Sequence, residues 1–116
     1  HPLSESNPEL ERALVKLSDQ ILGAYLIITS ATGSVPAFEP VLYATQVVAG
    51  ANYYVKMMVL PGGNSGGDSD YVLPKFIHVK IFDQSWTKTI ELTGISVNMT
   101  FQDPFEYDMP APPSPQ

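Results

Sequence analysis

The 116-residue chain contains no cysteine, which excludes disulfides, thiolate nucleophiles and thiolate metal ligands. Cationic side chains are also scarce: six Lys and Arg stand against twelve Asp and Glu, for a formal net charge of −6. Nucleic acids and anionic membrane surfaces are bound through basic patches, so neither is expected as a partner. The apolar run at residues 24–28 is far too short to span a bilayer.

Groups suited to catalysis or to metal binding are few as well. His1 and His78 are the only histidines, and no acidic residues are paired at a recognisable catalytic spacing. The glycine-rich loop at residues 61–70 lacks the Gly-Lys-Ser/Thr of a phosphate-binding loop, and its Asp68 and Asp70 lack the spacing of an EF-hand. We therefore expect no enzyme activity, no cofactor and no metal; a hydrolase that uses His78 is the less favoured alternative.

One amphipathic helix is predicted near the start of the chain. Asn7 is a suitable N-cap, Pro8 suits the first helical position, and Gly23 suits the helix end. The spacing predicts a helix over residues 8–23, whereas residues 25–29 have the composition of a strand. The predicted apolar face consists of Leu10, Ala13, Leu14, Leu17, Ile21 and Ala24.

Four segments rich in β-branched and aromatic residues follow the helix and predict strands. They span residues 38–44, 53–60, 76–82 and 89–97. One helix followed by strands in hairpin order predicts an α+β fold, in which an antiparallel sheet covers the helix with one face. A leading strand at residues 1–6 would make the four-stranded sheet five-stranded.

The third strand alternates, which predicts one face on the core and the other in solvent. Ile77 and Val79 lie on the expected core face, and His78 and Lys80 on the opposite one, so we expect His78 to be a solvated sheet residue. The domain is predicted to span residues 1–100.

A tail of different composition follows, over residues 101–116. Its acidic and aromatic part is expected to pack against the sheet. The last eight residues, 109–116, contain four prolines and predict a disordered or polyproline-like end. Residues 112–115 also match the proline spacing that SH3- or WW-like grooves bind, although a passive tail is favoured.

The connection between the first two strands carries apolar residues where a hairpin usually carries Asn-Gly or Asp-Gly. Val47 and Val48 lie at the tip, and only Gly50 takes a positive φ at low cost. Such a tip indicates a surface that another protein covers. Opening of this tight turn would also allow two chains to exchange halves, so a domain-swapped dimer is a hypothesis beside the expected monomer.

Gln46-Val47-Val48-Ala49-Gly50, followed by Asn52-Tyr53, resembles the first binding loop of the cystatin superfamily. In lacking cysteine, the chain resembles the stefins, a cysteine-free group within that superfamily. The resemblance covers about residues 2–97 and implies the cystatin fold, a bent antiparallel sheet wrapped around one long helix.

The resemblance also implies a function: reversible, tight-binding, competitive inhibition of papain-like cysteine proteases of the cathepsin L and B type. An N-terminal segment and two hairpins would fill the protease cleft. The implied contacts are Pro2, Leu3, Gln46, Val47, Val48, Ala49, Gly50, Ser85 and Trp86.

Two of these positions depart from the family pattern. Pro2 stands where stefins have Gly, and Ser85 stands where the second hairpin has Pro beside its Trp. The alternative is therefore a non-inhibitory protein-binding module on the same fold. For Trp86 we expect an exposed anchor, the alternative being a ring folded back on the sheet edge.

Localisation is predicted from two weaker features. The chain starts at His1, which fits removal of a signal peptide, and Asn98-Met99-Thr100 is a sequon for N-glycosylation at Asn98. Secretion is favoured narrowly, with a cytoplasmic location as the alternative, because the lack of disulfides suits a reducing compartment.

Overall fold

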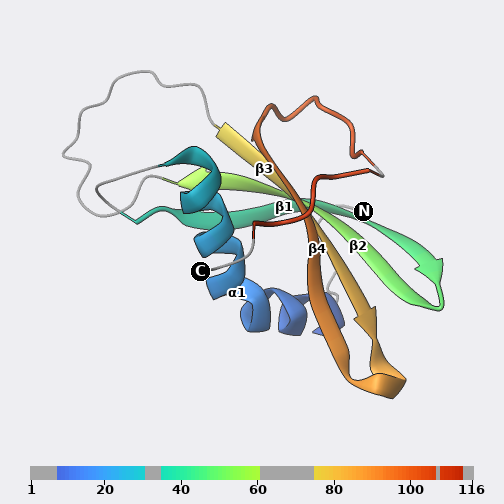
Figure 1. Ribbon diagram of the computed structural model, residues 1–116. Coiled ribbons are helices and arrows are strands. Elements are labelled where there is room, and N and C mark those ends of the chain that lie inside the picture. Colours follow the sequence, from blue (N-terminus) through green and yellow to red (C-terminus); the bar gives the residue numbers. More distant parts are fainter. Residues whose placement is uncertain (1–7, 31–34, 61–74, 107, 114–116) are drawn as a thin grey trace.

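The computed structural model describes residues 8–30, 35–60, 75–106 and 108–113. Its elements are α1 (Pro8–Thr29), β1 (Ala37–Val48), β2 (Gly50–Leu60), β3 (Lys75–Gln84), the 3-10 turn η1 (Ser85–Thr87) and β4 (Thr89–Met99). The strands pair antiparallel in the order β1-β2-β3-β4, and α1 packs against one face of this sheet (Figure 1). The predicted α+β, cystatin-like architecture is confirmed. The suggested strand at residues 1–6 and the loop with Asp68 and Asp70 lie outside the described residues.

The core forms between the apolar face of α1 and the inner face of the sheet. Leu10, Ala13, Leu17, Ile21 and Ala24 are all buried, as their spacing predicts. From β3 come Ile77, Val79 and Ile81, each fully buried, which confirms the predicted core face of this strand.

The predicted end of the helix at Gly23 and the strand expected at residues 25–29 are wrong. α1 continues to Thr29, and Ser30 follows it with a left-handed φ of 54°. Tertiary contacts outweigh the β-propensity of this last turn, because Ala24 is buried in the core and the ring of Tyr25 packs edge-on against Phe38 at 5.2 Å.

Since Gly23 lies inside a helix, replacing it with alanine is expected to stabilise the protein. A Cβ atom added at Gly23 meets nothing within 4 Å. Helix propensity then favours Gly23→Ala by roughly 1 kcal/mol, which corresponds to about 4 °C in Tm. Thermal unfolding followed by circular dichroism measures this difference, and a lower Tm for the variant would contradict a continuous helix through this position.

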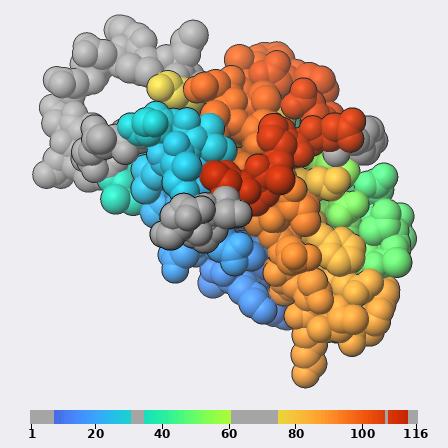
Figure 2. Space-filling view, viewed as in Figure 1, coloured from blue at the N-terminus to red at the C-terminus, as the bar shows by residue number. Residues whose placement is uncertain are grey.

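The C-terminal tail wraps around the edge strand β4. Phe101 and Phe105 lie on the sheet face opposite α1, where the Phe101 ring packs against Phe76 at 5.7 Å. The tail then passes the β4 edge, where the Ile95 N–H donates a 2.9 Å hydrogen bond to the Pro110 carbonyl. Figure 2 shows its last described residues in red, lying between the orange β4 and the cyan end of α1.

This path confirms that the acidic and aromatic part of the tail packs on the sheet. Of the two alternatives predicted for residues 109–116, disorder is wrong for the described part, and a polyproline-like conformation stays a prediction. Met109 is buried against Gly94, where an added Cβ would come within 2.7 Å of the Met109 Cβ. Pro112 and Pro113 are half-buried and line a hollow together with Ala24 and Ile27 of α1. A polyproline-binding domain would therefore have to displace these two prolines.

The tail also overturns the prediction that His78 is solvated. His78 is fully buried beneath Phe105, with ring centroids 4.9 Å apart, and neither ring nitrogen has a hydrogen-bond partner among the described residues. Lys56 lies beside it and donates hydrogen bonds from Nζ to the carbonyl oxygens of Phe101 and Asp103. Alternation in β3 placed His78 on the outer face correctly, but it did not indicate that the tail covers this face.

Burial makes the stability of this region depend on pH. Burial lowers the pKa of His78 to about 4 from 6.5, and the positive charge of Lys56 also lowers it, while Asp103 acts in the opposite direction. Between these two pH values the unfolded chain binds a proton at His78 that the folded chain does not bind. Stability is therefore expected to fall as the pH drops from 6.5 through about 4.

Urea unfolding between pH 7 and pH 4 tests this dependence. His78→Leu removes the titrating group and two unsatisfied nitrogens at similar volume, so its midpoint is expected to change less with pH than that of the parent. The hydrogen bond from the Thr100 N–H lowers the pKa of Asp103 from 3.8. The stability that this carboxylate contributes is therefore lost mainly below pH 4, in the parent and in the variant alike. Parallel profiles would contradict the assignment to His78.

Candidate functional site at the hairpin tips

The β1–β2 hairpin is paired almost to its end. The register runs to Val47 opposite Ala51 and Val48 opposite Gly50, which leaves only Ala49 outside the two strands. The connection between the two predicted strands, expected over residues 45–52, is therefore only one residue long. Val47 is 84% exposed and Val48 42% exposed, so the tip presents apolar side chains to solvent as predicted.

Gly50 is required at this tip for two independent reasons. Its φ is +123°, a conformation that side chains with a Cβ rarely adopt. An added Cβ would also lie 2.7 Å from the Asp83 carbonyl oxygen and 3.1 Å from the Phe82 ring, both on β3. The first hairpin tip therefore rests directly on the end of β3.

Gln46 is directed back along its own hairpin. Its Oε1 accepts hydrogen bonds from the Tyr54 hydroxyl at 3.0 Å and from Asn52 Nδ2 at 3.2 Å, both on β2. These bonds connect β1 and β2 through side chains just below the tip. Gln46 therefore supports the tip, while Val47 and Val48 provide its apolar surface.

The second hairpin, between β3 and β4, turns through η1. Lys88 closes the turn with a left-handed φ of 56° and donates a 3.1 Å hydrogen bond from its backbone N–H to the Ser85 carbonyl. Trp86 is 67% exposed, so its ring is available to a partner and does not lie folded against the sheet edge. Ser85 beside it is exposed as well.

The two tips lie on the same side of the molecule because β2 and β3 are neighbours in the sheet (Figure 1). The structure thus brings together seven of the residues that the sequence assigned to the site. They are Gln46, Val47, Val48, Ala49, Gly50, Ser85 and Trp86. Pro2 and Leu3 lie outside the described residues.

One polar residue at this end was not singled out from the sequence. Gln84, at the end of β3, donates a 2.8 Å hydrogen bond from Nε2 to the Ala49 carbonyl on the other hairpin. Its importance depends on the pairing of Ala51 with Asp83, which places the two turns side by side. No local motif contains that register, so Gln84 could not be recognised from the sequence.

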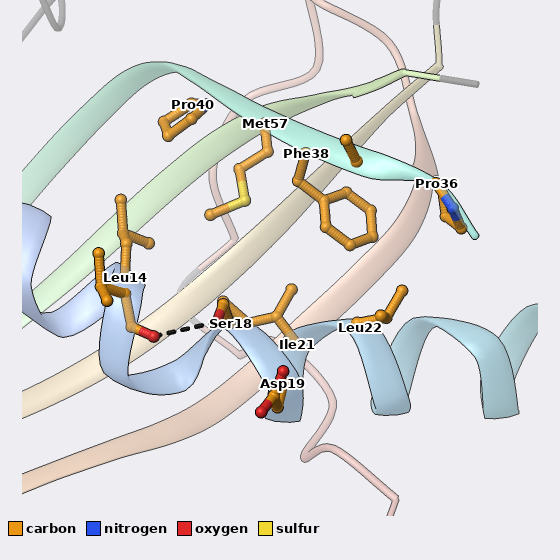
Figure 3. Close-up of a pocket in the computed structure, with 11 residues that line it drawn as sticks. Leu14, Ser18, Asp19, Ile21, Leu22, Pro36, Phe38, Pro40 and Met57 are labelled. Carbon is orange, nitrogen blue, oxygen red and sulfur yellow. Dashed lines mark hydrogen bonds between the residues drawn. The ribbon is translucent and has the colours of Figure 1, made fainter. Parts of the chain in front are cut away.

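A shallow groove lies elsewhere, between α1 and β1 (Figure 3). Its lining is mostly apolar, with Leu14 and Leu22 facing Phe38 and Met57 across it. The Ser18 hydroxyl donates to the Val15 carbonyl of its own helix at 3.0 Å, so it is not directed at a ligand. In the part of the chain that the structure describes, no three His, Asp or Glu side chains are grouped as metal ligands.

No protein-family model matches the chain. Among curated proteins it is similar to cystatin-A of Mus musculus, 42% identical over 71 residues, which are 60% of this chain and 61% of the mouse protein. It is also similar to cystatin-A1 of Sus scrofa, 41% identical over 68 residues, which are 57% of this chain and 54% of the pig protein. The chain is cystatin-like.

A third relative of this cystatin-like chain is leukocyte cysteine proteinase inhibitor 1 of Sus scrofa, 34% identical over 68 residues, or 57% of this chain and 54% of that protein. Its name describes an inhibitor of cysteine proteinases. The chain spans between about half and two thirds of the length of these relatives. The resemblance read from the first hairpin and from the missing cysteines is confirmed.

Proposed function

We propose that this cystatin-like chain is a reversible, tight-binding, competitive inhibitor of papain-like cysteine endopeptidases. The observation that carries the proposal is the placement of exposed Val47, Val48 and Trp86 on two adjacent hairpin tips. Exposed apolar side chains gain free energy when a partner's cleft covers them and removes them from water. The name of leukocyte cysteine proteinase inhibitor 1 supports a cysteine protease as the partner.

Inhibition without cleavage follows from how the tips are built. The backbone at Ala49 and Gly50 is closed into a turn by the β1–β2 ladder and rests on β3, so it is not the extended strand that a protease cleaves. Burial of the two valines supplies a few kcal/mol of gross binding free energy at roughly 25 cal/mol per Å2. Trp86 adds the larger anchor, and association costs reduce the total.

Pro2 and Leu3 are proposed as the third contact, and proteases of the cathepsin L and B type as targets. Inhibition of papain and of these two cathepsins by the full chain tests the proposal, with a fluorogenic peptide as substrate. Nanomolar inhibition that is relieved by excess substrate is expected. No inhibition at micromolar protein would favour the alternative, a non-inhibitory binding module on the same fold.

No described helix is long and apolar enough to cross a membrane. Secretion stays a prediction; Asn98 and Thr100 of the sequon are both exposed, and Asn98 has a left-handed φ of 60°. Glycosylation at Asn98 is proposed on that basis. The domain-swapped dimer also stays a prediction. The valines at the tip do not favour opening of the turn through backbone strain, because Gly50 carries the positive φ there.

A further inference from the structure

We propose that Gln84 is a positioning residue that holds the two hairpin tips together as one rigid binding surface. This inference rests on the proposed inhibitory function and adds to it a residue that does not itself belong to the apolar contact surface. The side-chain amide of Gln84 reaches from the end of β3 to the carbonyl of Ala49.

The strand ladder does not extend to the two tips, although Gly50 lies against the end of β3. Pairing between β2 and β3 ends at Ala51 opposite Asp83, and the two strands then diverge into their own hairpins. Ala49 on one side and Ser85–Thr87 on the other lie beyond this last pair. The hydrogen bond of 2.8 Å from Gln84 Nε2 to the Ala49 carbonyl crosses this gap.

The amide is held in one orientation by both of its ends. The Ala49 carbonyl only accepts hydrogen bonds, so the amide nitrogen has to face it. The amide oxygen accepts a 2.8 Å hydrogen bond from the Thr87 hydroxyl within η1. The hydroxyl oxygens of Thr87 and Thr89 are 2.7 Å apart, and either hydroxyl can donate. Because the single hydroxyl proton of Thr87 is donated to Gln84, Thr89 is the donor of this pair.

A rigid connection matters because both tips must enter one cleft. If the tips move independently, the protease has to order each of them on binding, and that ordering costs affinity. With the Gln84 amide in place, the position of Val47 and Val48 relative to Trp86 is set before the partner arrives. Gln84 thus contributes through preorganisation and not through direct burial.

Removing the amide is expected to weaken inhibition without unfolding the protein. Gln84→Leu keeps a similar volume and loses both hydrogen bonds, and we expect papain inhibition about tenfold weaker. Gln20→Leu is the matched control, since Gln20 is an exposed residue of α1. If Gln84 served stability alone, its replacement would lower the Tm but would not change the inhibition constant at temperatures far below the Tm. Unchanged inhibition by Gln84→Leu would overturn the proposal.

Gln84→Glu provides a pH-dependent version of the same test. A carboxylate places two acceptors against the Ala49 carbonyl and the Thr87 hydroxyl, so the bridge to Ala49 is lost at neutral pH. The protonated carboxyl has one donor and one acceptor and restores both bonds. Relative to the parent, inhibition is expected to be weak at pH 7 and to recover towards pH 4.5; a constant ratio across this range would count against the bridge.

A measurement without protease separates this proposal from the proposed function. Backbone NMR order parameters at residues 47–50 are expected to fall in Gln84→Leu and to stay at the parent value in Gln20→Leu. If the parent does not inhibit papain, the inhibitory function fails, and the order parameters alone decide whether Gln84 joins the tips. Equal order in parent and Gln84→Leu would overturn the positioning role.

Discussion

Gly50→Ala is expected to weaken inhibition of papain-like proteases about 100-fold. The new Cβ would lie 2.7 Å from the Asp83 carbonyl oxygen, at a φ of +123°. Backbone strain of this kind costs roughly 1–3 kcal/mol, and overpacking costs a similar amount. The tip relieves both by moving away from β3, which takes Val47 and Val48 out of line with Trp86. The inhibition constant against papain measures the loss, at about 1.4 kcal/mol for each factor of ten.

Gly23→Ala is the matched control for this substitution. It adds the same methyl group at a helical position with nothing within 4 Å, so its inhibition constant is expected to equal that of the parent. Inhibition by Gly50→Ala within threefold of the parent would show that the tip tolerates displacement from β3. The two-hairpin surface would then not be the binding element.

Trp86→Ala is expected to cost at least about 30-fold in inhibition, or roughly 2 kcal/mol, as is usual for a central aromatic anchor. The ring is 67% exposed in the free protein, so its removal should leave the Tm nearly unchanged. An unchanged Tm together with weaker inhibition separates a binding residue from a folding residue. Surface plasmon resonance with immobilised papain measures the difference as a faster off-rate.

Val15→Ala controls for the loss of an exposed apolar side chain. Val15 is 76% exposed on α1 and belongs to neither hairpin. Its replacement is expected to leave the off-rate unchanged. An equal loss of affinity for Val15→Ala and Trp86→Ala would place the contact surface elsewhere on the molecule.

The parts of the fold that follow from periodicity were predictable from the sequence. The apolar face from Leu10 to Ala24 and the alternation of Ile77, Val79 and Ile81 are both buried as expected. The first hairpin was predictable for a different reason: Gly50 is the only residue near Val47 and Val48 that accepts a positive φ at low cost. Local rules of this kind need no knowledge of distant segments.

The rest depended on contacts between segments far apart in the chain. The helix extends past Gly23 because Ala24 reaches the core and Tyr25 meets Phe38. His78 is buried because Phe105, 27 positions later, covers it. Propensity and alternation describe neighbours along one element, and they do not show which distant residue covers its other face.

In the candidate site, too, local features were predictable from the sequence and long-range contacts were not. Val47, Val48 and Trp86 were recognisable as exposed apolar residues at turns, and the structure places them so. Gln84 was not recognisable, because its partner Ala49 is 35 positions away and is reached only through the β2–β3 register. The resemblance implied a proline at Ser85; in the structure a hydrogen bond from the Thr87 hydroxyl to the Gln84 side chain stabilises the turn without it.

The central claim is tested most directly by steady-state inhibition of active-site-titrated papain by the full chain. The assay varies the fluorogenic substrate, measures recovery of activity on dilution, and checks by mass spectrometry that the chain is still intact. The account predicts nanomolar, competitive and reversible inhibition with no cleavage at Ala49 or Gly50. Papain that stays fully active at micromolar protein, or that cleaves the first hairpin, would contradict it.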